Sequence, residues 1–181
     1  MVLILIYAFE KSLPKRKSTH YWIIGGISLC LIGDATLQWF FIGLTAFFIG
    51  HVLYIVGFLK EWRFSLPRSL SAVPLILFAV WIGYQLVSSL QTNAETGFIF
   101  PVISYIGIIT LMAFTAIMTG NRWAILGSLL FIISDSVLAW NMFITGFTGA
   151  HEVIMLTYYS AQFLIAHSLF TIDSKQKGMA W

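Results

Sequence analysis

The sequence predicts an all-α membrane protein: a polytopic transmembrane helical bundle of six full spanning helices, preceded by a short N-terminal partial helix. Among its 181 residues, 59% are hydrophobic and only 9% are charged, and the mean hydropathy is +0.90. Soluble globular domains carry far more charge than this. The apolar runs lack the sustained alternation of barrel strands, so helices, which satisfy their own backbone groups in lipid, are expected. The length suits one bundle, and we expect a single domain over residues 1–181.

The apolar runs differ in length. The first, residues 1–9, reaches only about 14 Å as a helix, which is less than half of the ~30 Å hydrocarbon core. Runs of about 18 residues or more can span the core. Polar residues, Gly or Pro separate six such runs, which cover residues 21–41, 42–59, 70–90, 98–118, 123–145 and 153–170.

The positive charges predict the orientation. All Lys and Arg fall in alternate connections and in the C-terminal tail: Lys11, Lys15, Arg16, Lys17, Lys60, Arg63, Arg68, Arg122, Lys175 and Lys177. The connections around Phe41, at 91–96 and at 146–152 carry none. Because positive loops stay inside, we expect an integral multi-pass cell-membrane protein with a cytoplasmic C-terminus. The charge suits contact with anionic membrane lipids, and no exposed basic domain for nucleic acid is predicted.

Two aspartates stand inside apolar runs, where an ionisable residue is costly and a functional role is the default hypothesis. Asp34 and Asp135 lie about thirteen and twelve residues from the inner ends of helices that both run outward, which predicts nearly equal depth near the bilayer centre. Their contexts, "LCLIGDATLQW" and "LFIISDSVLAW", resemble a weak parallel repeat. The alternative interpretation is structural, because a buried Asp can also hydrogen-bond to a neighbouring helix.

Other polar side chains reach similar depths. His51 lies at mid-depth with Tyr54 one turn later, and Tyr105, Tyr158, Tyr159 and Gln162 lie at comparable levels on other helices. For each of them an interhelical hydrogen bond is as good an explanation as substrate contact. His20, His151 and His167 lie near helix ends, where interfacial placement explains them. The single Cys30 and the absence of Cys/His ligand spacing argue against redox chemistry and structural zinc.

Three segments form a distinctive ordered set: "GDATLQWFFIGLTAFFIGHVLYIVGF" from Gly33, "SDSVLAW" from Ser134 and "YYSAQFLI" from Tyr158. Together they resemble the YhhN-like family of membrane proteins, which includes the mammalian lysoplasmalogenases. The resemblance implies a bundle of about eight helices that hydrolyses the vinyl ether bond of lysoplasmalogens, releasing a fatty aldehyde and glycerophosphoethanolamine or glycerophosphocholine. The family's first helix and the Lys-Pro that opens its second have no counterpart, so residues 1–9 are expected to be the tail of that second helix.

The resemblance and the buried aspartates point to the same chemistry. Cleavage of an enol ether needs a proton donor and a negative or basic group, as paired carboxylates provide in glycoside hydrolysis. Burial and a neighbouring like charge would keep one of Asp34 and Asp135 protonated near neutral pH. The family motifs place His51, Tyr54, Tyr158 and Gln162 as groups that orient water or the lysophospholipid substrate. No cofactor and no metal are expected.

Three other functions stay open. Buried Asp residues with a central His also suit a proton-coupled transporter of a lipid or small solute, although Pro14, Pro67, Pro74 and Pro101 lie in loops or near helix ends and do not break a span. A metal-dependent lipid hydrolase would use His51 and both Asp as ligands. A structural membrane subunit is the third alternative, and the buried carboxylates argue against it.

Overall fold

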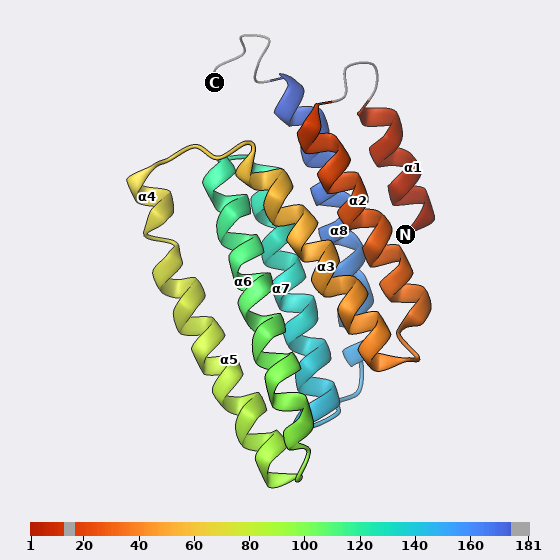
Figure 1. Cartoon of the computed structure of the whole chain (residues 1–181), viewed down its shortest axis with the longest axis vertical. Helices are drawn as coiled ribbons and strands as arrows, with labels where there is room; N and C mark the ends of the chain where they lie inside the picture. Colours follow the sequence, from red (N-terminus) through yellow and green to blue (C-terminus); the bar gives the residue numbers. More distant parts are fainter. Residues whose placement is uncertain (13–16, 175–181) are drawn as a thin grey trace.

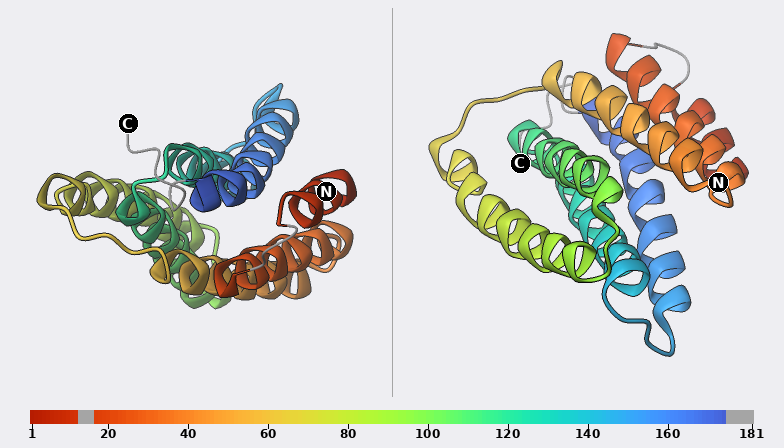
Figure 2. Two further views of the ribbon diagram at one scale, coloured as in Figure 1. Left: turned by 90° about the horizontal axis from the view of Figure 1, so that it is seen from above. Right: turned by 60° about the horizontal axis from the view of Figure 1, so that its bottom comes forward.

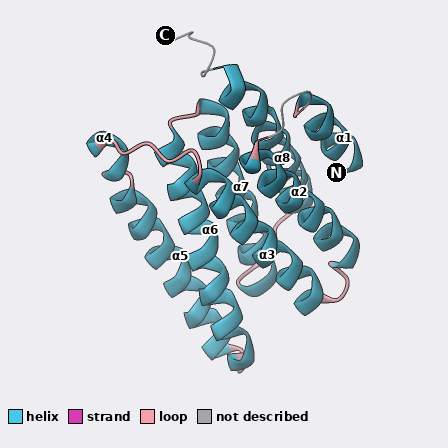
Figure 3. Cartoon of the chain, turned by 45° about the horizontal axis from the view of Figure 1, so that its top comes forward, coloured by secondary structure: helices cyan, strands magenta, loops and turns pink. Residues whose placement is uncertain are grey.

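The chain is built from helices joined by short connections. The computed structural model describes residues 1–12 and 17–174, and this part of the chain contains no strand (Figure 3). In order, its elements are α1 (Val2–Lys11), α2 (Ser18–Thr36), α3 (Phe40–Leu59), α4 (Leu66–Ser69), α5 (Ala72–Thr92), the 3₁₀ turn η1 (Thr96–Phe98), α6 (Ile99–Thr119), α7 (Arg122–Phe143) and α8 (Ala150–Ser174). The all-α prediction is confirmed, and the first apolar run forms the short helix α1.

Six helices form a closed ring. Each of α1, α2, α3, α6, α7 and α8 packs against the next, and α8 packs against α1 to complete the circuit. Helix α5 lies outside this ring, where it contacts α6 and the edge of α7. Figure 1 and the left panel of Figure 2 accordingly show α1 and α5 at opposite sides of the molecule. One face of α5 therefore has no helix against it within the described chain.

Small residues bring α2 and α3 into close packing. A Cβ added at Gly26 would lie 2.5 Å from the Tyr54 ring, and one added at Gly57 would lie 2.8 Å from Ile23. A Cβ added at Gly50 would lie 3.3 Å from the backbone oxygen of Gly26. Glycine at these positions lets two membrane helices approach closely, and van der Waals contact then holds them together.

The turn between α6 and α7 fixes the start of α7. Gly120 ends α6 in the left-handed region at φ 66°, which glycine adopts without strain. The Asn121 side chain then accepts hydrogen bonds from the backbone N–H groups of Trp123 and Ala124, and it donates one of 2.7 Å to Thr171 of α8. This N-cap ties the beginning of α7 to the end of α8.

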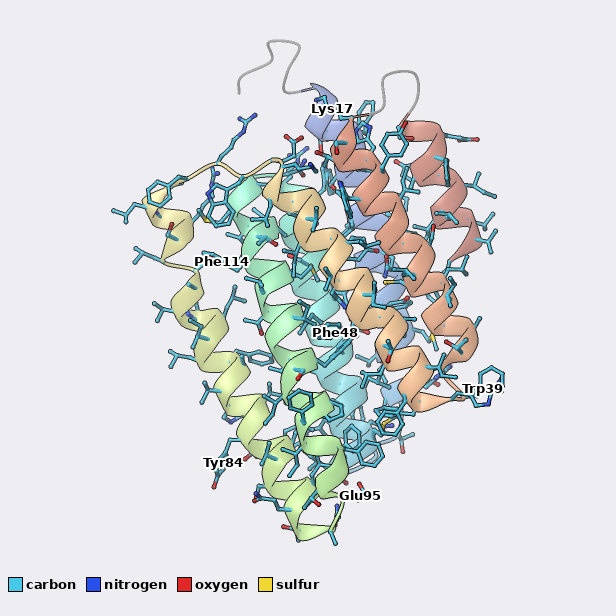
Figure 4. All side chains as sticks on the ribbon, viewed as in Figure 1. Lys17, Trp39, Phe48, Tyr84, Glu95 and Phe114 are labelled. Atoms are coloured by element: carbon cyan, nitrogen blue, oxygen red, sulfur yellow. The ribbon has the colours of Figure 1, made fainter. Side chains whose placement is uncertain are left out.

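The helices place the positive loops at one end of the bundle, as the alternation predicts. The start of α2, the end of α3, the start of α4 and the α6–α7 turn all lie at the end of the bundle where α8 ends (Figure 1). Figure 4 shows Lys17 at this basic end and Trp39 and Glu95 at the opposite end. Lys15, Arg16, Lys175 and Lys177 lie outside the described residues.

The number of spans differs from the prediction. Within the described residues 1–12 and 17–174, five helical stretches, rather than six, are long and apolar enough to cross a membrane: Phe40–Leu59, Leu66–Thr92, Thr96–Thr119, Arg122–Phe143 and Ala150–Thr171. The expected span at 21–41 corresponds to α2, which contains His20 and Asp34 among its 19 residues and is less apolar for that reason. Helix α2 also ends at Thr36, so a turn replaces the last residues of that predicted span.

The early end of α2 also overturns the internal repeat. Trp39 follows Asp34 by five residues but lies in the turn before α3, where its side chain is 57% exposed. Trp140, its counterpart after Asp135, lies inside α7 and stacks on Trp81 of α5 with ring centroids 6.0 Å apart. The two sequence segments are thus not structurally equivalent.

Candidate functional site

An apolar cavity of about 310 Å³ lies between α2, α3, α5, α6, α7 and α8. Most of its lining residues are apolar, chiefly Leu, Ile and Phe. The polar residues that line it are Asp34, Tyr105, Thr110, Ser134, Asp135, Ser136, His151, Tyr158 and Tyr159. A cavity with apolar walls and a few convergent polar groups is the usual form of a small-molecule site.

Asp135 enters the cavity from α7. Its Oδ2 accepts a hydrogen bond from the Tyr105 hydroxyl of α6. The preceding residue, Ser134, donates a 3.1 Å hydrogen bond to the backbone oxygen of Ile154 and so joins α7 to α8. The close contact of Gly127 with the α8 backbone, 2.9 Å from a built Cβ to the Ala161 oxygen, supports the same helix pair. Both neighbours of α7 therefore hold this carboxyl group in position.

Asp34 enters from the last turn of α2. Its half-buried carboxyl group lies beside the Tyr158 hydroxyl of α8, close enough for a direct electrostatic interaction. That hydroxyl is buried and has no hydrogen-bond partner among the described residues. Gly33 packs against the Phe47 ring, 2.8 Å from a built Cβ, which fixes the end of α2 on α3.

The two carboxyl groups thus share one cavity, but their helices do not form one of the main packing pairs of the described bundle. They face the cavity from different sides of the ring. Asp34 lies within the last turn of its helix, whereas Asp135 lies about two turns before the end of α7. Asp34 therefore lies closer to the end of the bundle opposite the basic loops than the predicted depth near the bilayer centre.

His51 does not line the cavity. Its Nδ1 lies 2.7 Å from the Phe47 carbonyl oxygen, and because a carbonyl only accepts, Nδ1 must carry the proton. The Nε2 atom of the neutral ring is then an acceptor, and it has no partner in the described structure. The ring lies edge-on to Tyr105, with centroids 5.5 Å apart, and to Phe131 at 4.7 Å. His51 consequently supports the tyrosine that binds Asp135.

Tyr54 and Gln162 also lie behind the cavity wall. The Tyr54 hydroxyl donates a 2.6 Å hydrogen bond to Gln162 Oε1, and both side chains are fully buried. The Gln162 Nε2 atom has no partner among the described residues. Cys30 of α2 lies next to both groups. This pair links α3 to α8 one turn beyond Tyr158.

The structure therefore separates the residues that the sequence singles out. Asp34, Asp135 and Tyr158 meet at the cavity, while His51, Tyr54 and Gln162 form a buried polar layer behind it.

The structure adds two residues to the site, Tyr105 and His151, which both line the cavity. Tyr105 is visible in the sequence only as a polar group at mid-depth, and its bond to Asp135 requires the α6–α7 contact. His151 begins α8 at the end opposite the basic loops, where it lines the cavity instead of serving only as an interfacial residue.

The ligand set of the metal hypothesis is not assembled. Among the described residues, no three His, Cys, Asp or Glu side chains lie together in an arrangement that could hold a metal ion. His51 packs on Tyr105 and does not line the cavity that both carboxyl groups enter.

Comparisons with known proteins identify relatives along most of the chain. The chain is 34% identical over 154 residues to Lysoplasmalogenase TMEM86B of Rattus norvegicus, covering 83% of this chain and 62% of the rat protein. It is 37% identical over 150 residues to the Homo sapiens protein of the same name, covering 80% and 61%. It therefore spans about three fifths of the length of these two relatives. The Uncharacterized membrane protein YhhN of Escherichia coli O157:H7 is 27% identical over 184 residues, covering 94% and 83%.

No solved structure matches this chain. The sequence model of the YhhN family matches residues 1–169, which is most of the chain. The chain therefore belongs to the YhhN family.

Proposed function

We propose that this protein hydrolyses the vinyl ether bond of a lysoplasmalogen within the membrane, using Asp34 and Asp135 as an acid and base pair. The observation that carries the proposal is that both carboxyl groups open into one apolar cavity. Relatives that cover most of the chain are named lysoplasmalogenases, which supports the same substrate class. A single-chain ether lipid has a polar headgroup and an apolar chain. The few polar residues of the cavity suit the first, and its apolar lining suits the second.

The reaction divides between two groups. One carboxyl group donates its proton to the β-carbon of the enol ether, and the double bond becomes an oxocarbenium-like cation. The other, ionised, stabilises this cation and takes a proton from the water that adds to the α-carbon. The second carboxyl group then passes its new proton to the leaving glycerol oxygen, while the first takes the proton of the hemiacetal hydroxyl as the ether C–O bond breaks. This gives a fatty aldehyde and a glycerophospho-alcohol and restores both carboxyl groups to their starting states. This division of labour between two carboxyl groups is that of glycoside hydrolysis.

The neighbouring side chains have positioning roles in this scheme. Tyr105 holds Asp135 through its hydroxyl group, and His51 packs against the Tyr105 ring. The Tyr158 hydroxyl interacts with Asp34 and has no geometric hydrogen-bond partner among the described residues, so it can hydrogen-bond water or a substrate oxygen. Tyr54 and Gln162 support α8 behind Tyr158. A fixed constellation of this kind lowers the barrier by holding the reacting groups in a productive geometry.

The first experiment compares two substrates. Detergent-purified protein is incubated with a lysoplasmalogen and with its saturated alkyl-ether analogue, and aldehyde is measured. We expect aldehyde from the vinyl ether alone, and in D₂O the aldehyde should carry one deuterium on the carbon next to the carbonyl. Aldehyde from both substrates would contradict protonation of the double bond, and aldehyde from neither would favour a transporter.

The second experiment tests the pair. Asp34→Asn and Asp135→Asn keep the shape of each side chain but remove its proton and its charge. We expect each to lower kcat at least about a hundredfold, the lower end of the usual contribution of a positioned acid or base. Matched thermal unfolding curves serve as the control for folding. Near wild-type kcat in either folded variant would disprove the pair.

We also infer that the basic end faces the cytoplasm. The described Lys and Arg lie at that end, and positive loops are retained inside. The cavity residues Asp34 and His151 then lie toward the outer face of the membrane.

A further inference from the structure

A second hollow lies on the outside of the ring, between α5 and α6. It is a groove of about 590 Å³ lined by one face of each helix, from Ala72 to Gly83 on α5 and from Ile103 to Phe114 on α6. Its lining residues include no charged side chain. Thr110 is the one hydroxyl, and it is already hydrogen-bonded to the Ile106 carbonyl within its own helix. The groove is therefore apolar along its full length.

Two glycines create this groove. A Cβ added at Gly107 would meet no atom of the described residues within 4 Å, and one added at Gly83 would meet only Ile106, at 3.7 Å. The α2–α3 glycines behave in the opposite way, because a Cβ at Gly26 would clash with Tyr54 at 2.5 Å. Small residues in membrane helices normally serve close helix packing. Gly83 and Gly107 instead leave space that neither helix fills.

The groove adjoins the cavity. Ala79, Ile106 and Thr110 line both of them. Helices α5 and α6 contribute these shared residues, so the two hollows meet where α5 packs on α6. From Gly83 to Ala72 the groove follows α5 toward the basic end for about 16 Å. That length is close to half of the ~30 Å hydrocarbon core, the depth that one lipid chain occupies in a leaflet.

We propose that the α5–α6 groove holds the hydrocarbon chain of the single-chain ether lipid whose headgroup end lies in the cavity. This inference rests on the proposed function and adds the route by which the substrate enters sideways from the bilayer. The headgroup lies near His151 and the opposite end of the bundle, the vinyl ether bond lies at the carboxyl groups, and the chain leaves between Ala79 and Ile106. The groove then selects lipids with one long chain.

Photolabelling tests this placement without any need for catalysis. The probe is a saturated alkyl-ether lysophospholipid with a diazirine at the end of its chain, which the reaction cannot cleave. Mass spectrometry should find the label on residues 72–83 or 103–114, and excess unlabelled single-chain ether lipid should compete it away. If the competitor does not reduce the labelling of these helices, the probe has reacted from the bulk lipid, and the proposal is wrong. Competable labelling confined to other helices would overturn it as well.

Substitution of the groove glycines supplies the second test. A Cβ at Gly107 or Gly83 meets no backbone atom of another helix within 4 Å, so we expect the ring in Gly107→Phe and Gly83→Phe to occupy the groove. Each should remove the competable label and lower kcat/KM for a long-chain vinyl ether roughly tenfold or more, because the reacting bond is displaced. A short-chain vinyl ether should be cleaved within about twofold of the wild-type rate. The control is Leu77→Trp on the lipid-facing side of α5, where the side chain is 65% exposed.

The outcomes separate the two proposals. If the wild-type protein takes the competable label in the groove but releases no aldehyde, the hydrolysis proposal is wrong and the lipid-binding groove is supported. If it releases aldehyde but is labelled elsewhere, hydrolysis is supported and the groove proposal is wrong. If Gly107→Phe instead changes the oligomeric mass, the groove holds a second copy of the chain and the lipid assignment is wrong.

Discussion

The hydrogen bond from Tyr105 to Asp135 offers a quantitative test of the site. Tyr105→Phe removes one hydroxyl group and keeps the ring that packs on His51, 5.5 Å away. A hydrogen bond to a charged group contributes about 1.5–3 kcal/mol. If that interaction holds Asp135 in the transition state, its loss should lower kcat roughly 10- to 150-fold, since each 1.36 kcal/mol is tenfold in rate.

The assay is release of fatty aldehyde from a vinyl ether lysophospholipid by purified protein, with kcat and KM determined separately. A positioning role predicts a fall in kcat with little change in KM, because the hydroxyl acts on Asp135 and not on the lipid. Tyr84→Phe is the matched control, since this tyrosine is 71% exposed on α5 and points away from the bundle (Figure 4). Wild-type kcat for folded Tyr105→Phe would refute the reasoning, and so would an equal loss in Tyr84→Phe.

Three further predictions concern stability and orientation. Gly26→Ala forces a methyl group within 2.5 Å of the Tyr54 ring and should destabilise the fold by about 1–3 kcal/mol, whereas Gly107→Ala should leave the melting temperature unchanged. Asn121→Ala removes the cap of α7 and should cost about 1–2 kcal/mol in thermal or denaturant unfolding, with unchanged stability contradicting the cap. A fluorescent protein that folds only in the cytoplasm should fluoresce when fused to the C-terminus, and a dark fusion would reverse the orientation.

The sequence predicted the helices well where hydropathy changes sharply and less well where it changes gradually. The predicted run at 98–118 differs by one residue at each end from α6, because η1 precedes it and Gly120 ends it. The predicted boundary near Phe41 was wrong, since apolar residues continue through the turn between α2 and α3. That turn forms because Gly33 and Gly43 let the two helices fold back closely on each other.

The sequence predicted which carboxyl groups belong to the candidate site but not how the surrounding side chains are arranged. A carboxyl group in an apolar run is visible in the sequence because of its cost, and this singled out Asp34 and Asp135. Their depth came from counting residues along ideal spans, an approach that fails for Asp34 because α2 ends early. His51 and Gln162 are also polar side chains in apolar helices, yet both are buried and neither lines the cavity. Helical position alone cannot distinguish these two environments.

The sequence by itself determined the fold class, the gathering of positive loops at one end and the presence of two costly carboxyl groups. Each follows from local properties, namely composition, run length and the position of Lys and Arg. Only the tertiary structure decided that these carboxyl groups share a cavity, that Tyr105 binds one of them and that α5 stands outside the ring beside an open groove. Those features depend on contacts between residues far apart in the chain, where side-chain volumes and glycine positions set how closely helices approach.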